Sequence, residues 1–253
     1  MVWIPRKWKD YTLTIHKSEG NDLEKREYWY RKINPYLIGF YCAVNIGLGF
    51  YYIILSQPYF YLLAFCAPLF LLLPIIWNRI FSLYPVYEFH FIIYFFCFLL
   101  YTVGLVMQGY SYIPFYDKFA HTLSGVFFTL LGVIFFYLLK PKKEIKKSDF
   151  PLLSVFCLSF SIAIAGIWEI GEYLVGTFFP SLDPQQVSIT GVNDTMQDII
   201  VCVLGSFLFY WGLVISFRKG KPNFLLAGFD TFFHKNIAKD FSSMSKSESN
   251  GLQ

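Results

Sequence analysis

Charged residues are scarce in this chain of 253 residues and make up 15% of it, against roughly 25% in a soluble domain. Hydrophobic residues make up 56% and aromatic residues 22%. The apolar residues stand in runs about 20 long, which match the ~30 Å hydrocarbon core of a bilayer at about 1.5 Å per helical residue. The composition therefore excludes an ordinary soluble domain and predicts an integral membrane protein.

Several motifs of common enzymes and metal proteins are missing as well. The five cysteines all fall in apolar runs, and no two of them form a CxxC pair, so we expect neither a disulfide framework nor a cysteine metal site. We find no P-loop, no GxGxxG fingerprint and no serine nucleophile elbow. The first 35 residues are polar rather than signal-like, so we expect the first apolar run to remain in the membrane uncleaved.

The apolar runs predict an all-α, polytopic membrane bundle of about six transmembrane helices, because no alternating strands of a β-barrel are visible. Pro68 and Pro74 predict a kink in the second span. We divide the chain into a polar arm at the membrane interface (1–35), a six-helix membrane domain (36–217) and a basic tail whose end we expect to be disordered (218–253). The predicted spans are Tyr36–Leu55, Pro58–Trp77, Val86–Gln108, Lys118–Leu139, Pro151–Val175 and Met196–Phe217.

The lysines and arginines predict the orientation of the bundle. In a six-span topology, 20 of the 21 basic residues lie on one side and Lys118 alone lies on the other. Basic loops stay in the cytoplasm, so both termini should be cytoplasmic. The net charge of +4 then follows from topology, and we expect membrane lipid rather than nucleic acid as the partner.

Acidic and histidine side chains gather at the ends of three predicted spans on the outer side. Asp117 and His121 open the fourth span, Glu169 and Glu172 close the fifth, and Asp194 and Asp198 open the sixth. Each pair is spaced three or four residues apart, so both members project from one face of their helix. Small residues follow on the same faces and should let the three helices pack closely: Ser124, Gly125, Ala165, Gly166 and Gly205.

Five carboxylates in one cluster cannot all stay ionised without compensation. Protonated acids, a cationic His121 and a bound divalent ion are the alternatives, and a set rich in carboxylates with one histidine suits Mg²⁺, Mn²⁺, Ca²⁺ or Zn²⁺. We predict Glu169 and Glu172 as catalytic residues, one of them a general base. The predicted metal ligands are Asp117, His121, Asp194 and Asp198.

Simpler roles remain open for individual members. Asp117 and Asp194 are candidate N-cap residues, His121 could lie at the headgroup level, and Glu172 could reach water by itself. Near the opposite end, Glu88 and His90 should mark the inner interface and pair with Arg79.

Three motifs resemble those of the YjdF-like bacterial inner-membrane proteins. Tyr116–Gly125 resembles their "YDKxxHxxxG" segment, Trp168–Glu172 their "ExxE" element, and Asn193–Asp198 their "WDTQxDM" element, with Asn193 in place of the tryptophan. The resemblance covers about residues 85–217 and implies a bacterial inner-membrane location and a shared fold. This family has no known activity. The Asp-Lys-x-x-His start is also similar, more distantly, to VanZ-like membrane proteins, which are tied to cell-envelope phenotypes.

Three functions fit these observations. The first is a metal-dependent enzyme that acts on lipid or cell-envelope substrates at the outer face. The second is a structural or accessory protein, in which the cluster only joins helices. The third is a proton- or cation-coupled transporter, because carboxylates and histidine inside a membrane often form relays, although here they crowd one side.

Overall fold

The computed structural model describes residues 20–140, 147–179, 187–219 and 227–236, and every regular element among them is helical. Six helical stretches are long and apolar enough to cross a membrane, which confirms the predicted all-α membrane bundle. They are Leu23–Ile54, Pro58–Ile80, Tyr87–Val106, Tyr116–Leu139, Phe150–Phe178 and Gly191–Ser216. Residues 1–19 of the predicted arm and 237–253 of the predicted disordered tail lie outside the described residues.

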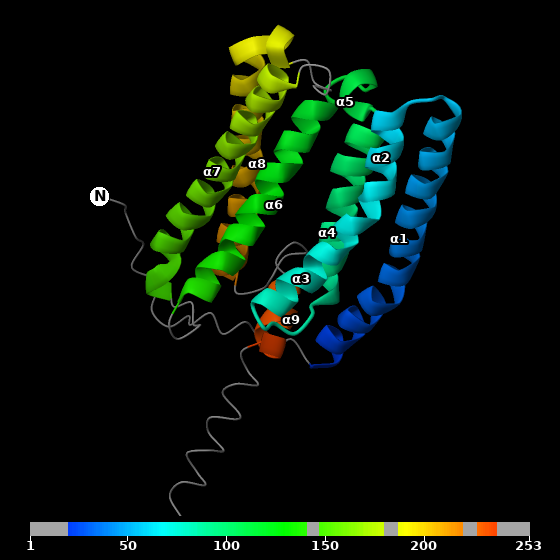
Figure 1. The fold of residues 1–253 in the computed structure, drawn as a ribbon. Coiled ribbons are helices and arrows are strands. Elements are labelled where there is room, and N and C mark those ends of the chain that lie inside the picture. The colour runs from blue at the N-terminus through cyan, green and yellow to red at the C-terminus, as the bar shows by residue number, and fades with distance from the viewer. Residues whose placement is uncertain (1–19, 141–146, 180–186, 220–226, 237–253) are drawn as a thin grey trace, which may run out of the picture.

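The first span begins earlier than the sequence predicts. Helix α1 starts at Gly20 and runs through Pro35, so the second half of the segment assigned to the polar arm is helical. Its start and the final helix α9 lie at the same end of the bundle (Figure 1). The elements are α1 (Gly20–Ile54), α2 (Pro58–Cys66), η1 (Ala67–Leu72), α3 (Leu73–Ile80), α4 (Tyr87–Cys97), η2 (Phe98–Val106), α5 (Gly109–Tyr112), α6 (Tyr116–Leu139), η3 (Lys147–Asp149), α7 (Phe150–Phe178), α8 (Val187–Lys219) and α9 (Ala227–Asn236).

The second and third spans depart from regular α-helix. Pro68 lies in the 3₁₀ segment η1 and Pro74 in the first turn of α3, and α3 turns away from the direction of α2 (Figure 1). The predicted kink is therefore observed. The Tyr41 hydroxyl donates to the Ala67 carbonyl at 3.1 Å, and Tyr101 donates to a carbonyl of α2 at 3.0 Å. Tyrosines of neighbouring helices thus hold this irregular span through its backbone carbonyls.

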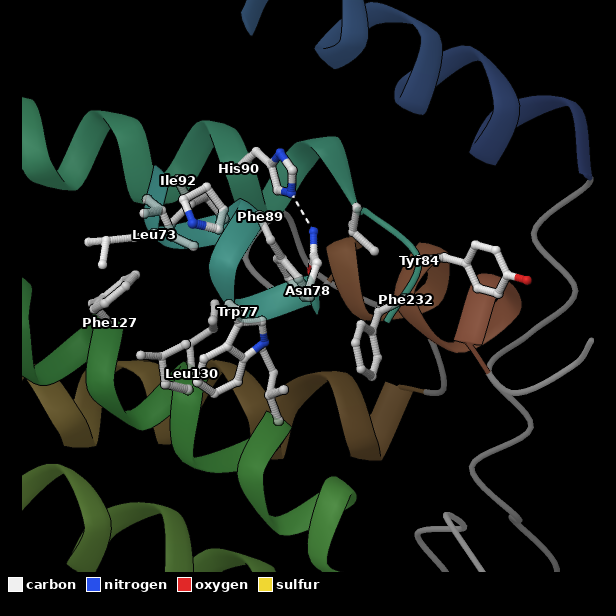
Figure 2. Close-up of a pocket in the computed structure, with 15 residues that line it drawn as sticks. Leu73, Trp77, Asn78, Tyr84, Phe89, His90, Ile92, Phe127, Leu130 and Phe232 are labelled. Atoms are coloured by element: carbon white, nitrogen blue, oxygen red, sulfur yellow. Dashed lines mark hydrogen bonds between the residues drawn. The ribbon is translucent and has the colours of Figure 1, made fainter. Parts of the chain in front are cut away.

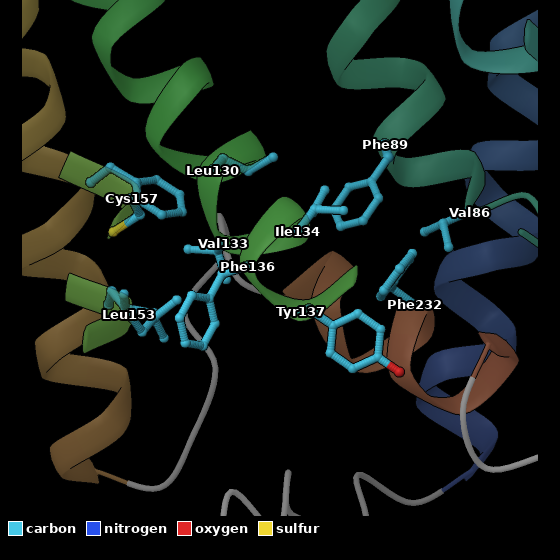
Figure 3. Close-up of a cluster of buried hydrophobic side chains, with 12 residues drawn as sticks. Val86, Phe89, Leu130, Val133, Ile134, Phe136, Tyr137, Leu153, Cys157 and Phe232 are labelled. Carbon is cyan, nitrogen blue, oxygen red and sulfur yellow. The ribbon is translucent and has the colours of Figure 1, made fainter. Parts of the chain in front are cut away.

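Helices α6, α7 and α8 pack against one another, and α1 packs against α2 and α4. A large apolar cluster joins α4, α6, α7, α8 and α9, with Phe89, Ile134 and Phe232 among its members (Figure 3). Large apolar residues also face outward, and Leu69 and Trp211 are 63% and 68% exposed. Such faces are rare on soluble proteins but suit lipid tails, which are as apolar as leucine.

Candidate functional site

The turn before α6 fixes where the site begins. Phe115 has a left-handed backbone (φ 61°) and is the N-cap residue of the helix, whose first residue is Tyr116. The Tyr116 hydroxyl donates to the Leu99 carbonyl of η2 at 2.7 Å. Asp117 therefore lies inside the first turn, and the alternative that it is the N-cap residue is wrong.

Lys118 is the centre of the ion pairs in the cluster. Its Nζ donates to Asp117 Oδ2 at 3.2 Å, to Asp194 Oδ1 at 2.5 Å and to Asp198 Oδ1 at 2.8 Å. Asp194 and Asp198 project from one face of α8, and Asp198 is only 1% exposed. One cation thus offsets charge on three carboxylates and joins α6 to α8. The sequence identified Lys118 as the only basic residue of that side but assigned it no partner.

His121 lies between two groups of carboxylates. Its Nε2 is 3.5 Å from Asp117 Oδ1 and 3.9 Å from Asp198 Oδ1. Its Nδ1 is 3.7 Å from Glu169 Oε1 of α7. The His121 side chain is 8% exposed. Two sets of ligand atoms therefore converge to within 4.8 Å: Asp117, His121 and Asp198 in one, and His121, Glu169 and Glu172 in the other.

Glu169 carries a buried acceptor without a donor. Its side chain is buried and accepts a hydrogen bond from the Thr195 hydroxyl of α8, yet Glu169 Oε1 has no hydrogen-bond partner among the described residues. The neighbouring Glu172 Oε1 accepts from Trp168 Nε1 at 2.8 Å. An unsatisfied buried polar atom costs about 1 to 3 kcal/mol, and more when charged. The atom that faces His121 Nδ1 therefore lacks a partner that either a proton or a bound cation would supply.

Tyr110 of α5 borders the cluster, and the sequence did not single it out. Burial raises the pKa of the Tyr110 hydroxyl, and the nearby Asp117 and Glu172 add to the rise. The group is therefore a neutral phenol, which donates to the Leu100 carbonyl at 3.1 Å. Among 19 tyrosines, the sequence holds no signal that marks this one.

Two glycines let α6 and α8 approach closely enough to assemble the site. A Cβ at Gly125 would lie 2.0 Å from the Cys202 carbonyl oxygen, and one at Gly205 would lie 2.0 Å from the Thr122 carbonyl oxygen. The Ser206 hydroxyl of α8 donates to Ser161 Oγ of α7 at 2.9 Å. The predicted packing of the last three spans is confirmed. Gly166 is different, because nothing lies within 4 Å of a Cβ built there.

Gly191 interrupts α8 just before the acidic pair. Its backbone angles are φ 66° and ψ −161°, a combination that is essentially restricted to glycine. The chain resumes its helical path after this kink, so Asp194 falls in the first turn and Asp198 one turn later. A tight turn of the backbone therefore sets the depth at which these two carboxylates meet Lys118.

The structure brings all six predicted site residues together at the end of the bundle where α6 and α8 begin and α7 ends (Figure 1). Glu88 and His90 lie toward the opposite end. The expected pairing with Arg79 is wrong: Glu88 accepts from Arg26 at 2.5 Å, and His90 Nε2 contacts Asn78 Nδ2 at 2.9 Å. Arg26 lies in the helical extension of α1 that the sequence did not predict.

Comparison with known proteins gives one match. The family described as "Predicted membrane protein (DUF2238)" matches residues 36–219, well over half of the chain. The YjdF-like proteins are this family, so the resemblance of the three motifs is confirmed. No curated protein and no solved structure matches the chain.

Proposed function

The chain belongs to the DUF2238 family of predicted membrane proteins, and we propose that this member is a metal-dependent membrane enzyme. In this proposal His121, Glu169 and Glu172 hold a divalent ion. The site faces away from the cytoplasm, as the charge distribution predicts. The substrate is a lipid or a cell-envelope precursor that reaches the site from the outer leaflet.

The observation that carries the proposal is the unsatisfied Glu169 Oε1, 3.7 Å from His121 Nδ1. Two atoms that ligate one tetrahedral ion at about 2.1 Å lie about 3.4 Å apart, so the separation is close to that of ligands awaiting an ion. A Glu172 oxygen lies within 4.8 Å of a ring nitrogen of His121 and of a carboxylate oxygen of Glu169. A single cation would satisfy all three acceptors.

The other side of the His121 ring supports the same assignment. A ligating histidine almost always donates its second ring N–H to a carboxylate, which fixes the ring. Asp117 Oδ1 is the nearest carboxylate oxygen to that nitrogen, 3.5 Å from Nε2, and it has no hydrogen-bond partner among the described residues, so it is available to accept this bond. Asp198 Oδ1 is an unfavourable ligand because Lys118 Nζ already contacts it at 2.8 Å. We therefore assign Asp117, Asp194 and Asp198 to orientation and charge balance rather than to the metal shell.

Three protein ligands leave a coordination position open, as in catalytic zinc sites. A mixed histidine and carboxylate set favours Zn²⁺ or Mn²⁺, and such an ion activates water and polarises a carbonyl or phosphoryl oxygen. Lys118 is engaged by three carboxylates. A phosphate of the substrate would therefore bind to the metal ion rather than to a basic side chain.

A structural or accessory role is the second candidate, and the contacts of Lys118 favour it. Its ion pairs connect α6 to α8, which is what a cluster that only joins helices would require. The two proposals differ in one respect: a structural cluster has no need of the acceptor at Glu169 Oε1, whereas a metal site does.

Metal analysis of the purified chain in detergent separates the two. The wild type is compared with Glu169→Gln and with Asp194→Asn, a matched control on the Lys118 side. We expect about one Zn²⁺ or Mn²⁺ per chain in the wild type and the control, and less than about one tenth of that in Glu169→Gln. An ion-free wild type after incubation with both metals, or an ion retained by Glu169→Gln, would overturn the metal site and leave the accessory role.

A further inference from the structure

A cavity of about 210 Å³ lies among α3, α4, α6 and α9 (Figure 2). Helices α3 and α9 lie at the end of the bundle opposite the start of α6, where the His121 cluster is (Figure 1). Its wall belongs to the spans themselves, since Phe89 and Leu130 lie inside the third and fourth of them. The wall is mostly apolar and includes Leu73, Trp77, Phe89, Leu130, Ile134 and Phe232.

The size of this cavity calls for an apolar occupant. Water takes about 30 Å³ per molecule and needs two to four polar partners, while an apolar cavity of about 150 Å³ stays dry and binds small hydrocarbons. The larger cavity here offers few polar atoms, so an empty state would leave its aromatic lining without contacts. At this depth of a bilayer, the abundant apolar species is the lipid acyl chain.

One edge of the cavity is polar, and a basic residue follows it directly in the sequence. Asn78 Nδ2 and His90 Nε2 contact each other at 2.9 Å in the wall (Figure 2). The next residue, Arg79, is exposed in the last turn of α3. Its guanidinium makes no ion pair with another residue in the described part of the chain. A basic residue at the membrane interface attracts anionic lipid headgroups.

Helix α9 borders the cavity on the side away from the His121 cluster. Phe232 contributes to the wall and packs on Phe89. Lys235, one turn later, donates to Glu27 of α1 and to the Pro85 carbonyl, the latter at 2.8 Å. Helix α9 is thus fixed to the first span, and Arg79, the residue after the wall residue Asn78, has no ion-pair partner among the described residues.

We propose that this cavity binds one acyl chain of an anionic phospholipid, whose headgroup pairs with Arg79. The apolar wall inside the membrane provides the chain site, and the guanidinium of Arg79, which has no ion-pair partner among the described residues, provides the preference for a negative headgroup. This inference is independent of the metal site, because the cavity shares no residue with the cluster around His121.

Lipid-dependent melting of the delipidated, full-length chain in detergent tests the proposal. The probes are phosphatidylglycerol and phosphatidylcholine with identical acyl chains. Leu130→Phe and Ile93→Phe fill the cavity from α6 and α4, Leu69→Phe adds the same bulk on an outward face, and Arg79→Gln removes the charge. At about 100 times Kd, we expect phosphatidylglycerol to raise the melting temperature of the wild type by about 5 to 10 °C.

We expect the rise to persist in Leu69→Phe and to disappear in both filling variants, and Arg79→Gln should respond equally to the two lipids. A wild type without a saturable rise, or filling variants that respond as it does, would overturn the proposal. If the filling variants do not fold, native mass spectrometry decides. A wild type that retains phosphatidylglycerol in preference to phosphatidylcholine, with no such preference in Arg79→Gln, supports the site, and equal retention of the two lipids by the wild type contradicts it.

Discussion

At the scale of single residues, the partner of each charged group defines what it can do. Helix spacing was sufficient to predict that six acidic and histidine residues share one end of the bundle. Helix spacing could not predict which carboxylates form ion pairs with Lys118, because Asp194 and Asp198 lie on another helix, 76 and 80 residues further along the chain. The division of the cluster into three aspartates beside Lys118 and two glutamates beside Trp168 and His121 needed the folded geometry.

Removal of the Lys118 charge should lower the free energy of unfolding, because its buried carboxylate partners lose their cation. In Lys118→Met, the nearly inaccessible Asp198 loses its cation, and breaking a buried pair costs about 3 to 5 kcal/mol. Thermal unfolding in detergent measures the loss. The matched control is Lys140→Met, which breaks the more accessible pair with Asp149 at 2.8 Å and should cost about 1 kcal/mol or less. Equal losses in the two variants would contradict the central position of Lys118.

Asp117 should act on the metal only through His121. In Asp117→Asn the ring loses its carboxylate partner, and such changes weaken metal binding by about 10- to 100-fold. Isothermal titration with Zn²⁺ gives the affinity. Complete loss of binding would instead make Asp117 a direct ligand, as the sequence predicted, and an unchanged affinity would remove it from the site.

At the scale of elements, the apolar runs predicted the spans and their number, because each run of about 20 residues is long enough to form one membrane-spanning helix. The irregular segments were only partly predictable. Pro68 and Pro74 predicted the kink in the second span, but nothing in the sequence marks η2 as π-helical. Small residues predicted which helices touch. The predicted close contacts at Gly125 and Gly205 are observed, and the one predicted at Gly166 is not. A small residue on a helix does not reveal whether a neighbouring helix faces it.

The two kinds of glycine give a matched pair of substitutions. Gly125→Ala places a methyl group against the backbone of α8 and should lower the free energy of unfolding by about 3 kcal/mol. It should also reduce metal binding, because pushing α6 away from α8 moves His121 relative to Glu169 and Glu172 of α7. Gly166→Ala meets no atom and should raise stability by up to about 1 kcal/mol through helix propensity. Thermal unfolding and metal content check both, and a harmless Gly125→Ala would refute the close approach.

At the scale of the whole molecule, the charged groups of the described residues gather at two ends, and apolar side chains cover the surface between them. The His121 cluster marks one end, and the contacts of Arg26, Glu88 and Lys235 mark the other. The uneven distribution of lysine and arginine predicts that the second end is cytoplasmic. Helix geometry alone does not fix which end faces outside, so the orientation is a separate prediction.

Reporter fusions test that orientation. Green fluorescent protein joined after Gln253 should fluoresce, since that end is predicted to be cytoplasmic, and alkaline phosphatase joined after Tyr112 should be active, since α5 lies at the other end. The reverse pattern, a dark fluorescent fusion with inactive phosphatase, would place the His121 cluster inside the cell and exclude outer-leaflet substrates.

X-ray absorption at the metal edge of the purified wild-type chain tests the metal centre most directly. The account predicts a light-atom shell at about 2.0 to 2.2 Å with the outer scattering of one imidazole, and the loss of that scattering in His121→Gln. A spectrum without imidazole scattering, or one that is the same in His121→Gln, would show that His121, Glu169 and Glu172 do not form the site.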